Sequence, residues 1–168
     1  LIALTGSSGK TTVKELLASI GAVAVGAEAV LATRGNLNNE IGVPLTLLEL
    51  NAQHRLAVIE LGASLPGELT WTRSLAQPRV VLINNAGMAH AGEFGGPEQI
   101  VRAKGEILDD LDSQSTAVLN LDDAAFEIWR ERSSAEKLLT FSVSSERADV
   151  YPREVAFAAD GCARFELC

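Results

Sequence analysis

The feature that most constrains the fold of this chain is the stretch LTGSSGKTT at residues 4–12. The apolar run 1–4 before it is typical of a buried strand, and apolar side chains at positions 13, 16, 17 and 20 after it have helical spacing. A glycine-rich turn between a strand and a helix presents backbone N–H groups and the positive end of the helix dipole to an anion. The stretch therefore predicts a phosphate-binding loop.

The residue types in this loop suit that role. Gly6 and Gly9 let the backbone approach an anion without an intervening Cβ. Lys10 can reach the β/γ-phosphates, and the hydroxyl of Thr11 can bind Mg²⁺. Leu4, however, occupies the place of the first glycine in the common pattern G-x-x-x-x-G-K-[ST]. The remaining G-x-x-G-K-T also occurs in ordinary solvated turns, so the flanking strand and helix carry part of the argument.

Composition limits the class of protein. The 168 residues are enough for one domain with its own core, and 47% hydrophobic with only 5% aromatic residues predicts an aliphatic core, as in a parallel sheet covered by helices. The net charge of −8 argues against nucleic-acid binding, and no apolar run is long enough for a membrane span. Cys162 and Cys168 lack metal-ligand spacing, so we expect a reduced, cytoplasmic protein.

Polar residues follow the expected strands. The apolar run 55–62 carries Glu60 near its end, as Walker B strands carry an acid near Mg²⁺. The run 79–85 leads into a loop with His90, and a strand ending at Asn120 follows. Each alone could be an ordinary surface acid, a structural histidine or a turn residue. Their convergence at the carboxyl edge of one parallel sheet is the stronger argument for a binding site.

Two further segments have competing interpretations. Asn36, Asn38 and Asn39 lie within four positions, which favours a polar binding loop over a simple turn, and Pro44 is expected to open the next helix. Lys104 lies in a helix expected from residue 96 to 108. Its spacing from neighbouring charges fits an exposed lysine in i,i+4 ion pairs.

Strand and helix patterns alternate at the spacing of βαβ units, which predicts an α/β fold with a doubly wound, mostly parallel sheet. The weak alternation over residues 149–168 predicts short antiparallel strands near the C-terminus. The chain begins directly in a strand pattern and ends without a stop signal, so we expect a piece of a larger protein.

Taken in order, the segments TGSSGKTTVKEL, ATRGNLNNEIGVPLTLL, VIELGA, NNAGMAH, RAKGEI and AVLNLDD resemble the central ATPase domain of the Mur ligase family. The resemblance covers residues 1 to about 125 well and the tail loosely. It implies that 1–168 form that central domain, without the N-terminal UDP-binding and C-terminal domains of the family. It also accounts for the missing first glycine, because the phosphate loops of this family have the shorter form.

The asparagine-rich loop is most similar to the branch that adds D-Ala-D-Ala to UDP-MurNAc-tripeptide. In the family, ATP phosphorylates a peptide carboxylate, and the incoming amine attacks the acyl phosphate to form an amide. The resemblance implies ATP and Mg²⁺ as cofactors, UDP-MurNAc-tripeptide and D-Ala-D-Ala as substrates of the full-length enzyme, and a cytoplasmic monomer. Because whole domains are missing, we expect little or no ligase activity from this chain alone.

The resemblance also assigns residue roles. Thr11 and Glu60 match ligands of a first Mg²⁺, and His90 and Lys104 match a second metal site. An ammonium cannot bind a cation, but this lysine is carbamylated by CO₂ in the family, so the resemblance overrides the exposed-lysine interpretation. Asn120 matches a position near the adenine, and the three loop asparagines face the substrate peptide. The residues that match the phosphate-binding loop are Gly6, Ser7, Ser8, Gly9, Lys10, Thr11 and Thr12.

Three alternatives remain open from the sequence. The chain could come from another Mur ligase or from a folylpolyglutamate synthase, which has a similar fold and chemistry. It could be a P-loop nucleotide-binding module without ligase chemistry, although such a module needs neither His90 with Lys104 nor the asparagine loop. A non-catalytic interaction module would leave the polar strand ends without a purpose.

Overall fold

The computed structural model describes residues 1–87 and 96–168. Its centre is a six-stranded sheet with the strand order β2-β3-β1-β4-β5-β6. Every neighbouring pair in this sheet is parallel, which confirms the predicted α/β class. The strands are β1 (Ile2–Thr5), β2 (Val30–Ala32), β3 (Leu56–Glu60), β4 (Val80–Ile83), β5 (Thr116–Asn120) and β6 (Lys137–Phe141).

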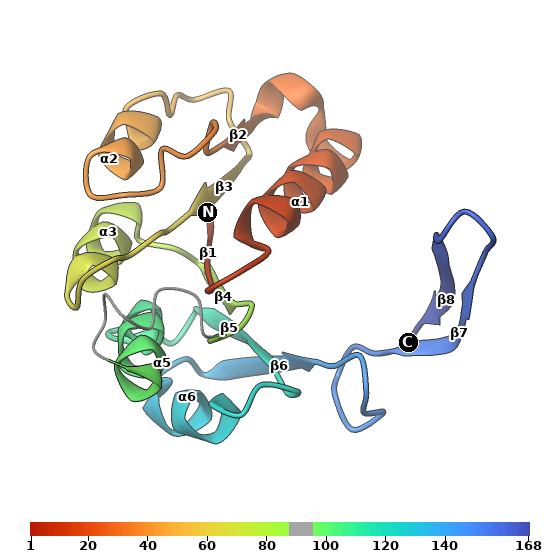
Figure 1. Cartoon of the computed structure of the whole chain (residues 1–168). Helices are drawn as coiled ribbons and strands as arrows, with labels where there is room; N and C mark the ends of the chain where they lie inside the picture. The colour runs from red at the N-terminus through yellow and green to blue at the C-terminus, as the bar shows by residue number, and fades with distance from the viewer. Residues whose placement is uncertain (88–95) are drawn as a thin grey trace.

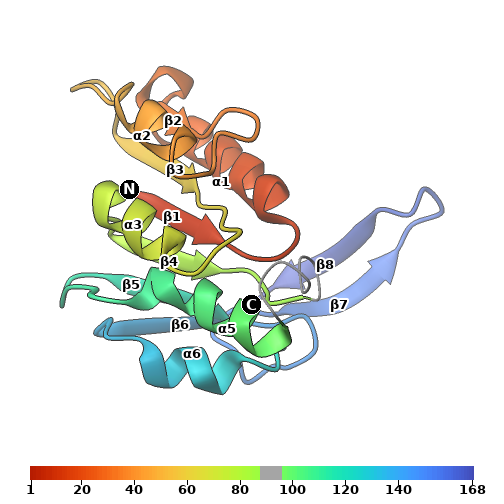
Figure 2. The ribbon, with the colours of Figure 1, turned by 60° about the vertical axis from the view of Figure 1, so that its left-hand side comes forward.

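Helices cover both faces of the sheet, as expected for a doubly wound fold (Figures 1 and 2). The crossover from β1 to β2 runs in one direction along the sheet, and the later crossovers run in the other. Because such crossovers are right-handed, α1 lies on one face and the other helices lie on the opposite face. The α-helices are α1 (Lys10–Val25), α2 (Gly42–Leu47), α3 (Glu68–Ala76), α5 (Pro97–Gly105) and α6 (Phe126–Arg132), with 3₁₀ turns η1 (Ala27–Ala29) and η2 (Glu106–Leu108).

The core lies between the sheet and these helices and is mainly aliphatic. Ala3, Ile59, Val81 and Leu119 of the four central strands are fully buried. A parallel sheet covered on both faces needs apolar residues on both faces of each strand, which explains the continuous aliphatic runs in the sequence. Trp129 of α6 is also fully buried, and its Nε1 donates to the carbonyl of Val101 at 3.0 Å.

The C-terminal residues form an antiparallel hairpin of β7 (Pro152–Phe157) and β8 (Ala163–Leu167), which confirms the short antiparallel strands. This hairpin projects away from the parallel sheet (Figure 1). Within the described residues, no helix is long and apolar enough to cross a membrane.

The expected helix start at Pro44 is wrong. Helix α2 begins at Gly42, and Pro44 is its third residue. The reason lies in Asn39, whose Oδ1 accepts hydrogen bonds from the backbone N–H groups of Ile41 at 3.3 Å and Gly42 at 2.8 Å. This side chain satisfies N–H groups that have no partner inside the helix, so the helix can start earlier.

Candidate functional site

The glycine-rich turn connects β1 to α1 and is held against the end of β4. Gly9 has a φ of 73°, in the left-handed region that glycine adopts without strain. A Cβ on Gly9 would also lie 2.9 Å from Nδ2 of Asn84, and one on Gly6 would lie 3.0 Å from the Asn84 Cβ. Gly9 is therefore favoured by its left-handed backbone, and Gly6 by the close approach of Asn84 and Asn85 after β4, in addition to any approach of a ligand.

Two asparagines after β4 brace this turn, a role that sequence reasoning missed. Asn84 Nδ2 and Asn85 Nδ2 donate to the Ser8 carbonyl at 2.8 and 3.1 Å, and Asn85 Oδ1 accepts from the Ser8 N–H at 3.0 Å. Asn120 supports them from β5, because its Nδ2 donates to the Asn84 carbonyl at 3.0 Å. Their position at the end of a strand was the available signal, since parallel strand ends meet at one edge.

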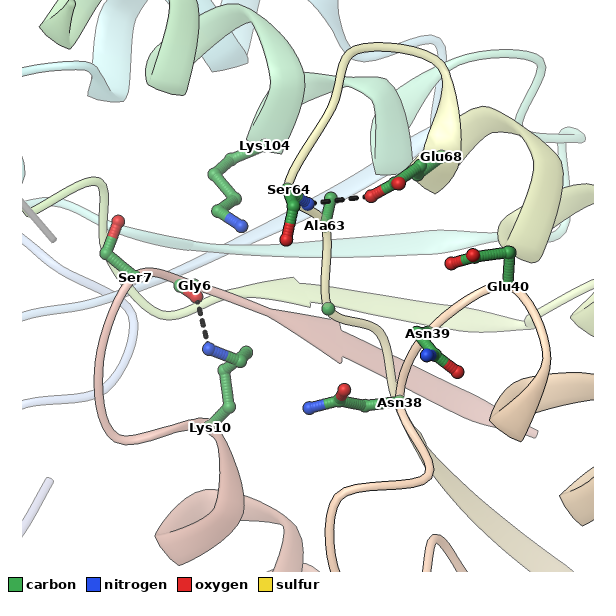
Figure 3. Close-up of a pocket in the computed structure, with 11 residues that line it drawn as sticks. Gly6, Ser7, Lys10, Asn38, Asn39, Glu40, Ala63, Ser64, Glu68 and Lys104 are labelled. Carbon is green, nitrogen blue, oxygen red and sulfur yellow. Dashed lines mark hydrogen bonds between the residues drawn. The ribbon is translucent and has the colours of Figure 1, made fainter. Parts of the chain in front are cut away.

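The turn exposes groups suited to an anion. No side chain among the described residues caps α1, and its first turn carries no acidic residue, so its N-terminal N–H groups and dipole face outward. The Lys10 ammonium donates to the Gly6 carbonyl at 2.9 Å (Figure 3). The buried Ser7 Oγ has no hydrogen-bond partner in the part of the chain that the structure describes. Thr12 is exposed on the first turn of α1.

Glu60 lies beside the turn at the end of β3. Its side chain is buried, and its Oε2 accepts from Thr11 Oγ1 at 2.9 Å while its Oε1 accepts from Asn38 Nδ2 at 2.7 Å. A carboxylate and a hydroxyl are the hard oxygen ligands that Mg²⁺ prefers when phosphates complete its coordination. Residues 1–87 and 96–168 contain no cluster of three or more histidine, cysteine or acidic side chains that could hold a metal ion without other ligands. The donor set fits a metal shared with phosphates.

Lys104 reaches the same edge from α5 and is buried, with 4% of its surface exposed. The exposed lysine that its spacing predicted is therefore wrong. Burial, and to a smaller extent the positive charge of Lys10, lower the pKa of the Lys104 ammonium to about 8, against the opposing effects of Glu106 and Glu68. Spacing could have indicated this, because Lys104 falls four residues after the buried Ile100 on the same helix face.

A polar cavity of about 410 Å³ joins these residues. Lys10 and Lys104 approach it from opposite sides, and Asn38 and Asn39 lie along a third (Figure 3). Glu68 was missed by sequence reasoning and also lines it, with its Oε2 accepting from the N–H groups of Ser64 at 2.7 Å and Leu65 at 3.1 Å. The lining residues are Gly6, Ser7, Lys10, Asn38, Asn39, Glu40, Gly62, Ala63, Ser64, Glu68 and Lys104.

The other predicted site residues have different placements. Asn36 is exposed and lies outside the cavity lining. Asn120 braces Asn84 and likewise does not line this cavity. His90 falls outside the described residues. The structure thus brings together the phosphate loop, Glu60, Lys104 and two of the three loop asparagines.

Residues 4–167 match the family model of the Mur ligase middle domain. The chain belongs to the Mur ligase family. A curated Mur ligase from Haemophilus influenzae, UDP-N-acetylmuramoyl-tripeptide–D-alanyl-D-alanine ligase, is 49% identical over 142 residues. That alignment takes in 84% of this chain but 31% of the relative, so the chain spans about a third of that relative's length.

Solved Mur ligase structures share the fold. A crystal structure of MurF from Acinetobacter baumannii has a TM-score of 0.91 and 44% identity, and covers 99% of this chain and 35% of the other. A MurF ligase from Thermotoga maritima in complex with ADP has a TM-score of 0.82 and 30% identity, with 99% of this chain and 37% of that chain covered.

Proposed function

We propose that this chain is the ATP-binding part of a ligase that joins D-Ala-D-Ala to UDP-MurNAc-tripeptide through an acyl phosphate. The observation that carries the proposal is the meeting of a phosphate-binding turn, the Thr11–Glu60 pair and the buried Lys104 around one cavity. The name of the Haemophilus relative supports the substrate assignment, and the ADP complex of the Thermotoga neighbour supports the nucleotide.

The nucleotide phosphates would lie across the turn. The N–H groups at the start of α1 supply donors, and Lys10 can exchange its bond with the Gly6 carbonyl for one with the γ-phosphate. Ser7 Oγ, buried without a partner among the described residues, is available to the same phosphates. The asparagine braces on Ser8 keep these donors in place before the ligand arrives. Gly6, Ser8, Gly9, Thr12 and Asn120 complete the proposed nucleotide-binding set.

Thr11 and Glu60 would hold the first Mg²⁺, and His90 with a carbamylated Lys104 would hold the second. Bound Mg²⁺ neutralises charge that develops on the phosphoryl group during transfer. Thr11 and Asn38 orient Glu60 for this role, because each donates a hydrogen bond to one of its two carboxylate oxygens. The catalytic residues are then Lys10, Glu60, His90 and Lys104, and Asn36, Asn38 and Asn39 belong to the substrate-facing loop.

Carbamylation of Lys104 is chemically accessible in this site. The neutral amine attacks CO₂, a C–N bond forms, the nitrogen releases its proton to solvent, and a carboxylate remains on the side chain. With a pKa of about 8, roughly a tenth of the amine is neutral at pH 7, far more than for an ordinary lysine. Lys10, across the cavity, can offset the new negative charge (Figure 3).

The remaining parts of the reaction would be supplied by other segments of the parent enzyme. This chain aligns with only 31% of the Haemophilus ligase, so binding of the UDP group and of the dipeptide is assigned to the rest of that polypeptide. We infer that the chain is a Mur ligase central domain acting as a cytoplasmic monomer without nucleic-acid partners.

Nucleotide titration and a ligase assay test this proposal. The chain should bind ADP and ATP more tightly with Mg²⁺ than with EDTA, by calorimetry or with a fluorescent ADP. It should form no amide from ATP, UDP-MurNAc-tripeptide and D-Ala-D-Ala. Absence of nucleotide binding would overturn the proposed site. Steady amide formation by the chain alone would overturn the proposal that other segments of the enzyme are needed for the ligase reaction.

A further inference from the structure

A second buried lysine lies beneath the nucleotide site and is not used by it. Only 1% of the Lys14 side chain is exposed, and its Nζ donates to the Thr33 carbonyl at 2.7 Å. Its charge is paired with Glu15 at 2.8 Å, at the exposed edge of α1. A lysine is almost never this buried without a specific pairing, so its contact with the end of β2 requires an explanation.

Thr33 connects this lysine to Glu60. Its side chain is buried, its N–H donates to the Val58 carbonyl at 3.1 Å, and its Oγ1 accepts from the Glu60 N–H at 2.9 Å. The hydroxyl therefore fixes the backbone of the residue whose carboxylate bonds Thr11 and Asn38. Thr33 thus bonds the main chain of Glu60, whereas Thr11 and Asn38 bond the Glu60 side chain.

These contacts close a ring of hydrogen bonds. Thr11 and Lys14 are three residues apart on α1 and therefore share a face of the helix. Thr11 bonds the end of β3 at Glu60, Lys14 bonds the end of β2 at Thr33, and Thr33 bonds Glu60. Helix α1 is thus hydrogen-bonded to the ends of both β2 and β3, which fixes its position along these strands.

The loop that carries Asn36, Asn38 and Asn39 connects two residues of this ring. It begins directly after Thr33, and Asn38 Nδ2 donates to Glu60 Oε1 at 2.7 Å. The Asn38 carbonyl also accepts from the Gly62 N–H at 2.7 Å. Any displacement of Thr33 would move both the backbone of Glu60 and the start of the loop.

We propose that Lys14 and Thr33 are positioning residues that set the Glu60 carboxylate for Mg²⁺ and couple it to the asparagine loop. The inference rests on the proposed function, because it assigns a purpose to a metal carboxylate. Neither residue lines the cavity. Both act through Glu60, as outer partners orient the ligands of metal sites.

The test measures how strongly nucleotide binding depends on metal. Thr33→Val keeps the shape of the side chain and removes the acceptor for the Glu60 N–H, whereas Thr33→Ser keeps the hydroxyl. A fluorescent ADP is titrated in EDTA and at rising Mg²⁺. In the Thr33→Val variant, the Mg²⁺ concentration that gives half of the metal-dependent increase in ADP affinity should be roughly 10–100-fold higher. The affinity for ADP in EDTA should be unchanged. Thr33→Ser should behave as the unmodified chain, and Lys14→Met should behave as Thr33→Val.

Two matched controls separate positioning from general loss of stability. Arg73 is another buried cation that donates to a backbone carbonyl, that of Asp110, at 3.2 Å, and it lines a different pocket. Ser115 carries another buried hydroxyl and lines the same pocket as Arg73. Arg73→Met and Ser115→Ala should lower the midpoint of urea unfolding without changing the Mg²⁺ requirement.

The outcomes distinguish the two levels of the argument. If the unmodified chain binds nucleotide with metal dependence and Thr33→Val and Lys14→Met need no more Mg²⁺ than the controls, the positioning role is wrong and the proposed function stands. If the unmodified chain does not bind nucleotide at all, the proposed function fails and this inference fails with it. A raised Mg²⁺ requirement confined to Thr33→Val and Lys14→Met supports the positioning role.

Discussion

Thr11 Oγ1 and Glu60 Oε2 lie 2.9 Å apart, although 49 residues separate them in the chain. The pair exists because β1 and β3 are adjacent and parallel, so the helix start after one strand meets the last residue of the other. The same adjacency places a hydroxyl and a carboxylate next to the glycine-rich turn. Four predictions test the site built around this pair.

Glu60→Gln should remove most of the Mg²⁺ dependence of ADP binding. The amide keeps the size of the side chain but loses the negative charge that a divalent cation requires. We expect the gain in affinity on adding Mg²⁺ to fall by about tenfold, or roughly 1.4 kcal/mol. Calorimetric titration with and without EDTA measures it, and an unchanged gain would show that Glu60 does not serve the metal.

Lys10→Ala should weaken nucleotide binding with or without metal. A hydrogen bond from a charged donor contributes about 1.5–3 kcal/mol, so affinity for ATP should fall roughly ten- to a hundredfold. Lys137→Ala is the control, because Lys137 is exposed at the start of β6. Equal effects of the two substitutions would mean that only net charge matters.

Lys104 should bind CO₂ in a pH-dependent way. Burial brings its pKa down to about 8, so the reactive neutral amine becomes the major form above that pH, whereas an ordinary lysine is still mostly charged there. With ¹³C-labelled bicarbonate, a carbamate signal should grow as pH rises through about 8 and weaken progressively as pH falls below it. Lys104→Arg should abolish the signal at every pH, and a signal that persists in this variant would come from another amine.

Gly42→Ala should displace the asparagine loop. A Cβ at Gly42 would lie 2.5 Å from the backbone of Leu37, next to Asn38, and backbone cannot move aside as a flexible side chain can. We expect a loss of about 1–3 kcal/mol in the free energy of unfolding, together with a higher Mg²⁺ requirement for ADP binding. Urea unfolding and the fluorescent ADP titration measure the two effects. Unfolding as in the unmodified chain would show that the loop accommodates a methyl group.

Local patterns in the chain were sufficient to predict the α/β class, the glycine-rich turn between a strand and a helix, and the acid at the end of β3. Strand and helix formation depend on periodicity over a few residues, and parallel strand ends always share an edge. The residue types of the turn and of Glu60 therefore indicated their chemistry before any contact was known.

The faces of the helices and the partners of the polar side chains depended on long-range packing. On α1 the buried positions are Lys14 and Gly21, while Leu16 and Ile20 of the apolar pattern are 59% and 66% exposed. Leu56 of β3 packs against Gly21 so closely that a Cβ there would lie 2.4 Å from the Leu56 side chain. Which side of a helix meets the sheet depends on strand order and crossover handedness, which involve residues far apart in the sequence.

Lys104 and the residues around Glu60 illustrate the same division. The spacing of charges around Lys104 indicated an exposed side chain. The packing of α5 buries it instead, and this burial lowers its pKa. The sequence placed a carboxylate at the sheet edge, but Thr11, Asn38 and Thr33 became its partners only when three separate segments met there. Chemistry carried by a residue type can be read locally, whereas burial, pKa and hydrogen-bond partners are set by the packing of segments distant in the chain.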